Sequence, residues 1–419
     1  MDRFLIEGPV RLHGEVRCSG AKNAVLPLMA AALLSRGVSE IRNVPDLRDV
    51  RTFMRLLDIL GARCGLVDGT LTIDTSGVQG CEAPYDLVKT MRASVYVLGP
   101  LTAFGGEARV SLPGGCAWGP RPVNLHLSGL EALGAEVDLD AGYIRTRAPS
   151  GGLRGGRFRF EPSSVGATCN VLMAAVLAAG VSELTNCAVE PEVTQLGRAL
   201  VGAGAQIDGL GTTHLVVTGV ERLEPLRCAV IPDRIEAGTF LAGAAMTGGD
   251  VTVTHCDPAH LEAVSAALEA MGCEVDEGPD RVRVRGPERL RPVEVVTRPY
   301  PAFATDMQAQ LMACACVARG TSHLTETIYP DRFTHAAELR RLGADIRLDG
   351  ATATVFGVAQ LQGAPVMATD LRASAALVLA GCAARGVTTV DRVYHIDRGY
   401  ERIEQKLEAL GARIRREQA

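Results

Sequence analysis

The sequence predicts an α/β protein of two domains, each made of three repeated α/β units with buried helices at the centre and sheets outside. Three observations lead to this fold class. At 419 residues, the chain is too long for one ordinary hydrophobic core. A Leu-Gly-Ala phrase recurs six times, and a run of small apolar residues precedes each copy.

The first repeated phrase is a helix-like run that ends in Leu-Gly-Ala, or a close variant, and continues into a short strand. Its glycines are Gly61, Gly134, Gly204, Gly272, Gly343 and Gly411. They follow one another at intervals of 73, 70, 68, 71 and 68 residues. Glycine directly after the last apolar position of a helix is a C-cap signal, because it enters the left-handed conformation without a steric penalty. We therefore expect six helices that end at these glycines.

The second repeated phrase is an apolar run of small residues, then a glycine, then a β-branched strand. Examples are AKNAVLPLMAAALLSRGVSEI from residue 21 and DLRASAALVLAGCAARGVTTV from residue 370. A helix that is apolar on all faces is buried rather than lying on the surface. Each repeat is therefore expected to hold a buried helix, a strand, an amphipathic helix that ends at glycine, and further strands.

Composition excludes several classes of protein. A net charge of −5 gives no sign of general nucleic-acid binding. The first residues lack a charged region followed by an apolar run, and apolar stretches such as 171–179 fall short of the ~18 residues that span a bilayer. The twelve cysteines are scattered and form no CxxC pair, which is typical of reduced, buried thiols. We expect a soluble cytoplasmic protein with no metal site and no cofactor.

The segment 112–122, LPGGCAWGPRP, is predicted to be a loop, because it contains three prolines and three glycines. Cys116 lies at its middle, and Arg121 follows five residues later. A thiol on an exposed loop near a cation is the setting in which cysteine does chemistry. The alternative is that Cys116 is one ordinary thiol among twelve.

Polar or charged residues stand at or just before the start of each apolar helix. They are Lys22, Asn23, Arg92, Ser164, Asp233, Arg234, Asp306, Asp370 and Arg372. Ser and Asp are routine helix caps, so capping alone explains some of them. It does not explain the cations, which oppose the helix dipole unless an anion lies between them and the helix start. This pattern favours a ligand that carries phosphate or carboxylate groups.

Six motifs are specific enough to indicate a family. They are SGAKNA at 19–24, MRAS at 91–94, LPGGCAWGPRP at 112–122, SVGAT at 164–168, FATDMQAQ at 303–310 and DRVYHIDRGYE at 391–401. Together they closely resemble the UDP-N-acetylglucosamine enolpyruvyl transferase family over essentially the whole chain. The resemblance implies an inside-out α/β barrel with one domain at 22–229, a second at 1–21 plus 230–419, and the active site in the cleft between them.

The resemblance also implies a reaction. The family transfers the enolpyruvyl group of phosphoenolpyruvate to the 3-hydroxyl of UDP-N-acetylglucosamine and releases phosphate, by addition and elimination through a tetrahedral ketal. This is the first committed step of peptidoglycan synthesis. The implied partners are these two small molecules, with no nucleic acid, no membrane and no cofactor, and we expect a monomer.

Four residues resemble the catalytic groups of the family: Cys116, Asp306, Lys22 and Arg398. Cys116 matches the acid that protonates phosphoenolpyruvate, and a thiol with a pKa of about 8.5 is mostly protonated at neutral pH, as an acid must be. The same thiol is alkylated by fosfomycin in the family. Asp306 matches the base for the sugar 3-hydroxyl. Lys22, Arg121 and Arg398 match the cations that bind phosphate and carboxylate.

The remaining matches are substrate contacts. Asn23 resembles a ligand of the sugar. The nucleotide-sugar contacts are matched by Arg92, Arg121, Pro122, Val123, Asn124, Leu125, Ser164, Val165 and Ile328. Arg332, Asp370, Leu371 and Arg372 also lie at matching motifs, although Arg332 and Arg372 can equally be read as structural salt bridges. His126 and His395 are expected to be hydrogen-bonded scaffold residues.

Two positions depart from the family pattern. Asn124 stands where an acidic residue is usual, and Pro162 and Ser163 stand where a basic residue often occurs. Each lost charged hydrogen bond is expected to weaken nucleotide-sugar binding by about 1–2 kcal/mol. Neither departure touches the acid or the base.

Three alternatives remain. The shikimate-pathway enolpyruvyl transferase shares the fold and phosphoenolpyruvate but lacks the Gly-Gly-Cys loop. A catalytically silent paralogue that binds UDP-sugars has no reason to keep Lys22, Cys116, Asp306 and Arg398 together. A purely structural repeat scaffold leaves the cations at the helix starts unexplained.

Overall fold

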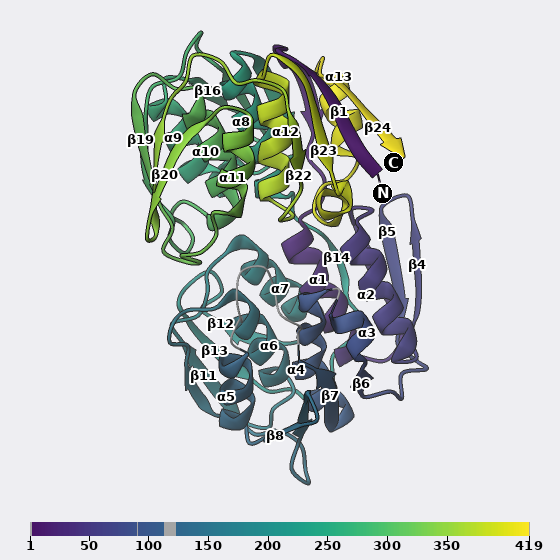
Figure 1. Ribbon diagram of the computed structural model, residues 1–419. Helices are drawn as coiled ribbons and strands as arrows, with labels where there is room; N and C mark the ends of the chain where they lie inside the picture. The colour runs from purple at the N-terminus through teal and green to yellow at the C-terminus, as the bar shows by residue number, and fades with distance from the viewer. Residues whose placement is uncertain (1, 90, 113–122, 419) are drawn as a thin grey trace. The chain divides into compact units, whose positions relative to one another are not determined.

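The computed structural model describes residues 2–89, 91–112 and 123–418 (Figure 1). It divides into two compact units. The middle unit is Gly20–Ile231, and the terminal unit joins Met1–Ser19 to Pro232–Ala419. The boundaries expected from the sequence are 22 and 229. Each unit has its own hydrophobic core.

Three largely buried helices form the centre of each unit. In the middle unit they are α1 (Lys22–Ala31), α4 (Leu98–Gly105) and α6 (Val165–Ala175). In the terminal unit they are α8 (Arg234–Thr247), α10 (Gln308–Cys316) and α12 (Ala373–Ala383). Every residue of α12 is buried, as expected for a helix that is apolar on all faces.

The other helices and helical turns lie outside these two triplets. The helices are α2 (Arg48–Ile59), α3 (Tyr85–Val88), α5 (Asn124–Ala132), α7 (Pro191–Gly202), α9 (Glu262–Ala270), α11 (Thr334–Arg341) and α13 (Ile403–Ala409). The 3-10 turns are η1 (Ala32–Leu34), η2 (Arg92–Val97), η3 (Pro258–His260), η4 (Thr305–Met307) and η5 (Val393–Arg398).

Each unit has three four-stranded sheets. In the middle unit, the strand order of the first sheet is β14 (Arg227–Ala229), β3 (Val38–Arg42), β5 (Thr70–Asp74), β4 (Arg63–Val67). The order of the second sheet is β6 (Glu82–Ala83), β7 (Glu107–Ser111), β9 (Tyr143–Arg147), β8 (Glu136–Asp140). The order of the third sheet is β10 (Arg157–Arg159), β11 (Val181–Thr185), β13 (His214–Thr218), β12 (Gln206–Asp208). In the terminal unit, the strand order of the first sheet is β2 (His13–Arg17), β15 (Asp250–Thr254), β17 (Arg281–Arg285), β16 (Glu274–Glu277). The order of the second sheet is β18 (Glu294–Val296), β19 (Thr321–Thr325), β21 (Thr352–Phe356), β20 (Asp345–Asp349). The order of the third sheet is β22 (Pro365–Met367), β23 (Gly386–Asp391), β1 (Asp2–Gly8), β24 (Arg413–Gln418).

All six sheets share one pairing pattern. The first strand of each order pairs parallel with the second, and the remaining pairs are antiparallel. The N-terminal strands complete two sheets of the terminal unit. β1 pairs with β23 and β24, so the purple and yellow ends of the chain lie side by side in Figure 1, and β2 pairs with β15. The repeats predicted from the sequence therefore correspond to six equivalent sheets around two sets of buried helices.

Small residues let the central helices approach closely. A Cβ added at Gly243 of α8 would lie 3.0 Å from Leu379 Cδ2 of α12 and 3.1 Å from Leu12 Cδ1. A Cβ at Gly99 of α4 would lie 2.3 Å from the carbonyl oxygen of Asn170 in α6. The runs of alanine and glycine in the sequence thus set the spacing of the helices, because a larger side chain has no room there.

The six repeated glycines are confirmed as left-handed residues. Their φ angles are +99° at Gly61, +86° at Gly134, +106° at Gly204, +94° at Gly272, +90° at Gly343 and +91° at Gly411. Each follows an amphipathic helix by one or two residues. The C-cap prediction from the Leu-Gly-Ala phrase is therefore correct.

The described cysteines are all free thiols. Eight of these eleven are buried and three are half-buried, so the expectation that the thiols are buried holds for most of them. Among residues 2–89, 91–112 and 123–418, no helix is both long and apolar enough to cross a membrane.

A pair of neighbouring glycines tests the C-cap assignment. Gly204 has φ +106°, whereas Gly202 is the last residue of α7, and an added Cβ meets no atom within 4 Å at either position. We expect Gly204→Ala to lower the free energy of unfolding by about 1–2 kcal/mol, because the strain is purely conformational. Gly202→Ala is expected to raise it by up to about 1 kcal/mol. Urea unfolding of both variants measures the difference, and equal effects would contradict the assignment.

Candidate active site

The residues predicted from the sequence fall into three groups. Cys116, Arg121 and Pro122 lie outside the described residues. Asp306, Ile328, Arg332, Asp370, Leu371, Arg372 and Arg398 belong to the terminal unit. Lys22, Asn23, Arg92, Val123, Asn124, Leu125, Ser164 and Val165 belong to the middle unit. Within the terminal unit, short polar contacts join several of these residues.

Asp306 and Arg332 form the first of these contacts. Asp306 lies in η4, directly before the buried helix α10. Its Oδ1 accepts a hydrogen bond from Arg332 Nη1 at 2.7 Å, and the same nitrogen donates to Thr305 Oγ1 at 3.1 Å. Arg332 Nη2 lies 3.5 Å from Asp370 Oδ1. Asp370 in turn accepts the backbone N–H groups of Arg372 and Ala373, both at 2.9 Å, at the start of α12.

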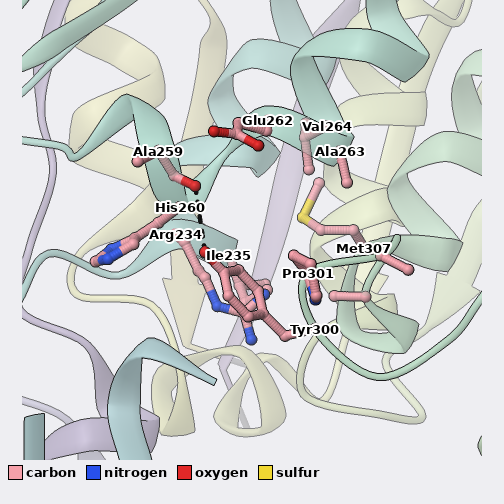
Figure 2. A pocket seen from close by; sticks show the side chains of 12 residues that line it. Arg234, Ile235, Ala259, His260, Glu262, Ala263, Val264, Tyr300, Pro301 and Met307 are labelled. Carbon is pink, nitrogen blue, oxygen red and sulfur yellow. Dashed lines mark hydrogen bonds between the residues drawn. The ribbon is translucent and has the colours of Figure 1, made fainter. Parts of the chain in front are cut away.

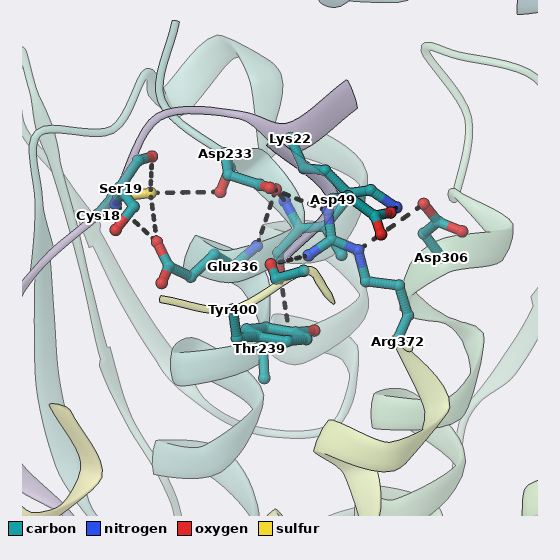
Figure 3. Close-up of polar contacts among 12 residues, drawn as sticks. Cys18, Ser19, Lys22, Asp49, Asp233, Glu236, Thr239, Asp306, Arg372 and Tyr400 are labelled. Carbon is teal, nitrogen blue, oxygen red and sulfur yellow. Dashed lines mark hydrogen bonds and ion pairs between the residues drawn. The ribbon is translucent and has the colours of Figure 1, made fainter. Parts of the chain in front are cut away.

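Arg372 approaches the second oxygen of Asp306 (Figure 3). Its Nε lies 4.0 Å from Asp306 Oδ2, its Nη2 donates to Asp233 Oδ2 at 2.9 Å, and its Nη1 donates to the carbonyl oxygen of Gly399 at 3.1 Å. Asp233 also caps α8, since its Oδ1 accepts the N–H groups of Ile235 and Glu236. The sequence analysis noted Asp233 only as a polar residue at a helix start.

Both arginines therefore form salt bridges, and their partners are the carboxylates of Asp306, Asp370 and Asp233. Arg332 and Arg372 are only 7% and 2% exposed at their side chains. Burial alone lowers the pKa of each guanidinium, but Asp306 beside Arg332 and Asp233 beside Arg372 raise it well above its usual range. Burial raises the pKa of Asp370, but Arg332 and the backbone N–H of Ala373 lower it below its ordinary value. All three groups stay charged at neutral pH.

Asp306 is the most accessible carboxylate of this cluster. Its side chain is 26% exposed, compared with 12% for Asp370 and 4% for Asp233. Guanidinium groups lie near both of its oxygens and hold the carboxylate in one orientation. The arrangement can present an oriented, accessible carboxylate to a hydroxyl group, which is what a general base requires.

Glu326 is a buried carboxylate that sequence reasoning missed. Its Oε1 accepts from Thr297 Oγ1 and from the N–H groups of Ile328 and Tyr329, and its Oε2 accepts from Thr305 Oγ1. Glu326 therefore holds the backbone of Ile328 and the side chain of Thr305, which directly precedes Asp306. A glutamate directly after the half-buried end of a strand, in TET at 325–327, was the available signal.

Arg398 is half-buried at the end of η5, which contacts α12. The next residue, Gly399, accepts the hydrogen bond from Arg372 Nη1. A Cβ added at Gly399 would lie 2.6 Å from Leu371 Cδ2. The glycine thus allows η5 to pack against Leu371, and the predicted residues of the terminal unit are brought to one end of α12.

Lys22 is the first residue of α1, and its ammonium lies 2.9 Å from Asp49 Oδ2. Asp49 belongs to α2 and its side chain is only 4% exposed. The carboxylate partner explains how a cation is held at a helix start that repels it. Asp49 lies in the first turn of an amphipathic helix, where an acidic residue is ordinary, so nothing in the sequence distinguished it.

Asn170 connects the other middle-unit residues. Its Nδ2 donates to His126 Nδ1 and to the carbonyl oxygen of Val95, both at 2.9 Å, and its Oδ1 accepts the N–H of Gly99 at 2.5 Å. Arg92 opens η2, the turn that contains Val95. The buried amide of α6 therefore holds η2, α4 and α5 together, and His126 is the hydrogen-bonded scaffold residue that the sequence predicted.

The starts of α5 and α6 lie against each other at His126. A Cβ added at Gly166 would lie 3.2 Å from His126 Nε2. Ser164 caps α6, since its Oγ accepts the N–H of Ala167 at 3.3 Å. Helix α5 begins at the exposed Asn124, with Val123 before it and Leu125 after it, and helix α6 begins at Val165. These predicted contacts therefore lie at neighbouring helix starts.

A pocket of the terminal unit opens beside η4 (Figure 2). The starts of α8 and α9 and the segment before α10 line it, and its residues include Arg234, His260, Glu262, Tyr300 and Met307. Arg234 lies 5.4 Å from the ring centre of Tyr300. Met307 follows Asp306 directly. No group of three or more His, Cys, Asp or Glu side chains in the described part of the chain is arranged to hold a metal ion.

Comparison with known proteins decides the family. The family described as EPSP synthase (3-phosphoshikimate 1-carboxyvinyltransferase) matches residues 6–407. The UDP-N-acetylglucosamine 1-carboxyvinyltransferase of Anaeromyxobacter sp. (strain Fw109-5) is 57% identical over 422 residues and covers 100% of both chains. This chain belongs to the enolpyruvyl transferase family. The resemblance inferred from the six motifs is thereby confirmed.

Further relatives agree. The UDP-N-acetylglucosamine 1-carboxyvinyltransferase of Myxococcus xanthus is 53% identical, with 100% of both chains covered. Among solved structures, the enolpyruvyl transferase NikO from Streptomyces tendae matches with a TM-score of 0.90 and 28% identity, covering 100% of this chain and 99% of its own. EPSP synthase from Acinetobacter baumannii matches over 100% of both chains with a TM-score of 0.75 and 18% identity, which supports the fold alone.

Two buried histidines make the stability sensitive to acid. Burial lowers the pKa of His126 and of His335 to about 4, from an ordinary value of 6.5. A lowered folded-state pKa stabilises the protein fully above pH 6.5, and the contribution is lost as pH falls towards 4. We expect the loss to reach about 3 kcal/mol for each histidine.

The variant His335→Met tests this prediction, since methionine cannot titrate. Urea unfolding between pH 7 and pH 4 should show a smaller loss of stability for this variant than for the wild type. The same change at the exposed His323 is the control and should leave the loss unchanged. An unaltered pH dependence in His335→Met would contradict the assignment.

Proposed function

We propose that this protein transfers the enolpyruvyl group of phosphoenolpyruvate to the 3-hydroxyl of UDP-N-acetylglucosamine and releases phosphate, as the first committed step of peptidoglycan synthesis. The observation that carries the proposal is 53–58% identity to UDP-N-acetylglucosamine 1-carboxyvinyltransferases over 99–100% of the chain. The structure of an EPSP synthase shares only 18%. The identity therefore favours the nucleotide sugar over shikimate 3-phosphate as the acceptor.

The proposal includes the finer fold. We infer that each unit is an inside-out α/β barrel, with helices inside and sheets outside. In its support, α8, α10 and α12 of the terminal unit contact one another pairwise, and α6 of the middle unit contacts both α1 and α4. Three equivalent sheets complete each core. Each unit has its own core, so the proposed monomer needs no partner chain to complete a fold. The free thiols support a reducing, cytoplasmic location.

Asp306 is proposed as the base and Cys116 as the acid. Addition requires a proton for the methylene carbon of phosphoenolpyruvate and removal of the proton from the sugar hydroxyl, whose oxygen bonds to the neighbouring carbon. Elimination then removes a proton from the new methyl group, restores the double bond and breaks the bond to phosphate, which leaves with a proton. Arg332 and Arg372 orient the carboxylate of Asp306. They support the reaction as positioning residues, because both are buried and paired with carboxylates.

The anionic substrate groups are assigned to cations of both units. Lys22, Arg121 and Arg398 are proposed to bind the phosphate and carboxylate of phosphoenolpyruvate. The buried Asp49 holds the ammonium of Lys22 at the start of α1, which preorganises it for an anion. The nucleotide sugar is assigned to the neighbouring starts of α5 and α6, with Asn23, Arg92 and Ile328. Asn124 is expected to make a neutral contact there instead of a charged one.

The substrate assignment is tested by phosphate release. With phosphoenolpyruvate present, we expect release with UDP-N-acetylglucosamine and none with shikimate 3-phosphate. Release with shikimate 3-phosphate alone would place the chain in the sibling branch of the family. Absence of release with either acceptor would favour the catalytically silent paralogue.

The role of Cys116 is tested by two substitutions. Cys116→Ser should abolish turnover, because a hydroxyl is a far weaker acid than a thiol. Cys116→Asp should keep measurable activity and resist fosfomycin, because it retains an acid but lacks the nucleophilic sulfur. Turnover and fosfomycin inhibition of the three forms are the measurements. Full activity in the serine variant, or fosfomycin sensitivity in the aspartate variant, would remove the thiol from its assigned role.

A further inference from the structure

The chain passes between the two units twice, at Ser19–Gly20 and at Ile231–Pro232. On the terminal-unit side, Asp233 N–H donates to the carbonyl oxygen of Ser19 at 2.9 Å. On the middle-unit side, Ala21 N–H donates to the carbonyl oxygen of Ile231 at 2.7 Å. On each side of the crossing, a backbone hydrogen bond thus joins the two chain segments at the point where they leave the unit.

A buried ion pair lies at the terminal-unit side of this crossing. Glu236, in the first turn of α8, has a side chain only 2% exposed. Its Oε1 accepts from Lys406 Nζ at 2.8 Å, and its Oε2 accepts the N–H of Ser19 at 2.6 Å. Lys406 belongs to α13, so the ion pair joins α8 and α13 to Ser19, where the N-terminal segment of this unit ends.

Further polar contacts surround the pair. Lys406 Nζ also donates to Ser19 Oγ at 2.7 Å, and Ser19 Oγ donates to Glu401 Oε2 at 2.8 Å. Cys18 Sγ lies 3.7 Å from Glu236 Oε2 and 3.3 Å from the carbonyl oxygen of Asp233. Figure 3 shows Cys18, Ser19 and Glu236 grouped on one side of Asp233. The residue at the crossing is therefore held through its N–H, its carbonyl and its hydroxyl.

The same network continues to the proposed base. Asp233, bonded to Ser19 through its backbone, holds Arg372 through its carboxylate at 2.9 Å. Arg372 lies 4.0 Å from Asp306. A series of hydrogen bonds within the terminal unit thus leads from Lys406 through Ser19 and Asp233 to Arg372, and a longer ion pair of 4.0 Å links Arg372 to Asp306.

We propose that Lys406 and Glu236 are positioning residues for enolpyruvyl transfer: their ion pair fixes the crossing at Ser19 and, through Asp233 and Arg372, the orientation of the Asp306 carboxylate. The inference rests on the proposed function. A buried ion pair contributes little net stability compared with apolar residues of the same size, but it favours one geometry of its partners over others. Loss of the pair would therefore alter the chemical step more than the binding of substrates.

The variant Lys406→Met removes the ammonium and keeps a long side chain. We expect kcat to fall about tenfold or more, while KM for phosphoenolpyruvate and for UDP-N-acetylglucosamine stays within about twofold. Counting only the chains that fosfomycin alkylates, by intact mass, corrects kcat for misfolded protein. Lys89→Met is the matched control, because Lys89 pairs with Asp86 at an exposed site in α3, and it should match the wild type.

A double variant separates positioning from stability. Lys406→Met alone leaves the buried Glu236 without its cation, so its urea midpoint should fall. In Glu236→Gln/Lys406→Met, no buried charge is left unpaired and the midpoint should return towards the wild-type value. We expect kcat to stay reduced about tenfold, because Ser19 Oγ has still lost its bond to the ammonium.

Three results would contradict these expectations, and they bear differently on the positioning role and on the proposed function. Recovery of kcat together with stability in the double variant would reduce the pair to a structural role and overturn the inference. An active wild type beside an unimpaired Lys406→Met variant would overturn the positioning role and leave the proposed function standing. A wild type that releases no phosphate would overturn the proposed function, and the positioning role with it.

Discussion

The packing of three largely buried helices in each unit constrains the rest of this protein. Small and apolar side chains fill most of the space between α8, α10 and α12, as the close approach at Gly243 illustrates. Polar groups that serve a reaction must therefore lie at the ends of these helices. Asp233, Asp306 and Asp370 stand at or next to the starts of the three helices of the terminal unit, and the same helix packing that excludes them from the core brings them together.

Charge balance at these helix starts follows from burial. A guanidinium as buried as Arg372 requires carboxylate partners, and Asp233 and Asp306 supply them. Lys22 has the corresponding partner in Asp49. Lys22 and Arg372 are thus held by carboxylates of their own unit, and arginines lie beside both oxygens of the accessible Asp306 carboxylate. This links the stability of the helix ends to the geometry that the proposed chemistry requires.

Residues without a motif of their own provide much of this support. Glu326 fixes the backbone around Ile328 and Thr305, Asn170 joins three elements around His126, and Glu236 with Lys406 fixes Ser19. Such a residue looks the same in a sequence whether it caps a helix, faces solvent or ties distant segments together, because its partners lie up to 387 residues away along the chain.

The sequence alone determined the repeats, the six left-handed glycines, the buried character of the central helices and the family. These depend on local periodicity, on the steric freedom of glycine and on contiguous motifs, all of which can be read along the chain. The tertiary structure alone decided that Arg332 and Arg372 pair with carboxylates, that Asp49 holds Lys22, and that Asp233 connects Ser19 to Arg372. Those pairings arise when helix packing brings distant residues within hydrogen-bond distance, and no local pattern records them.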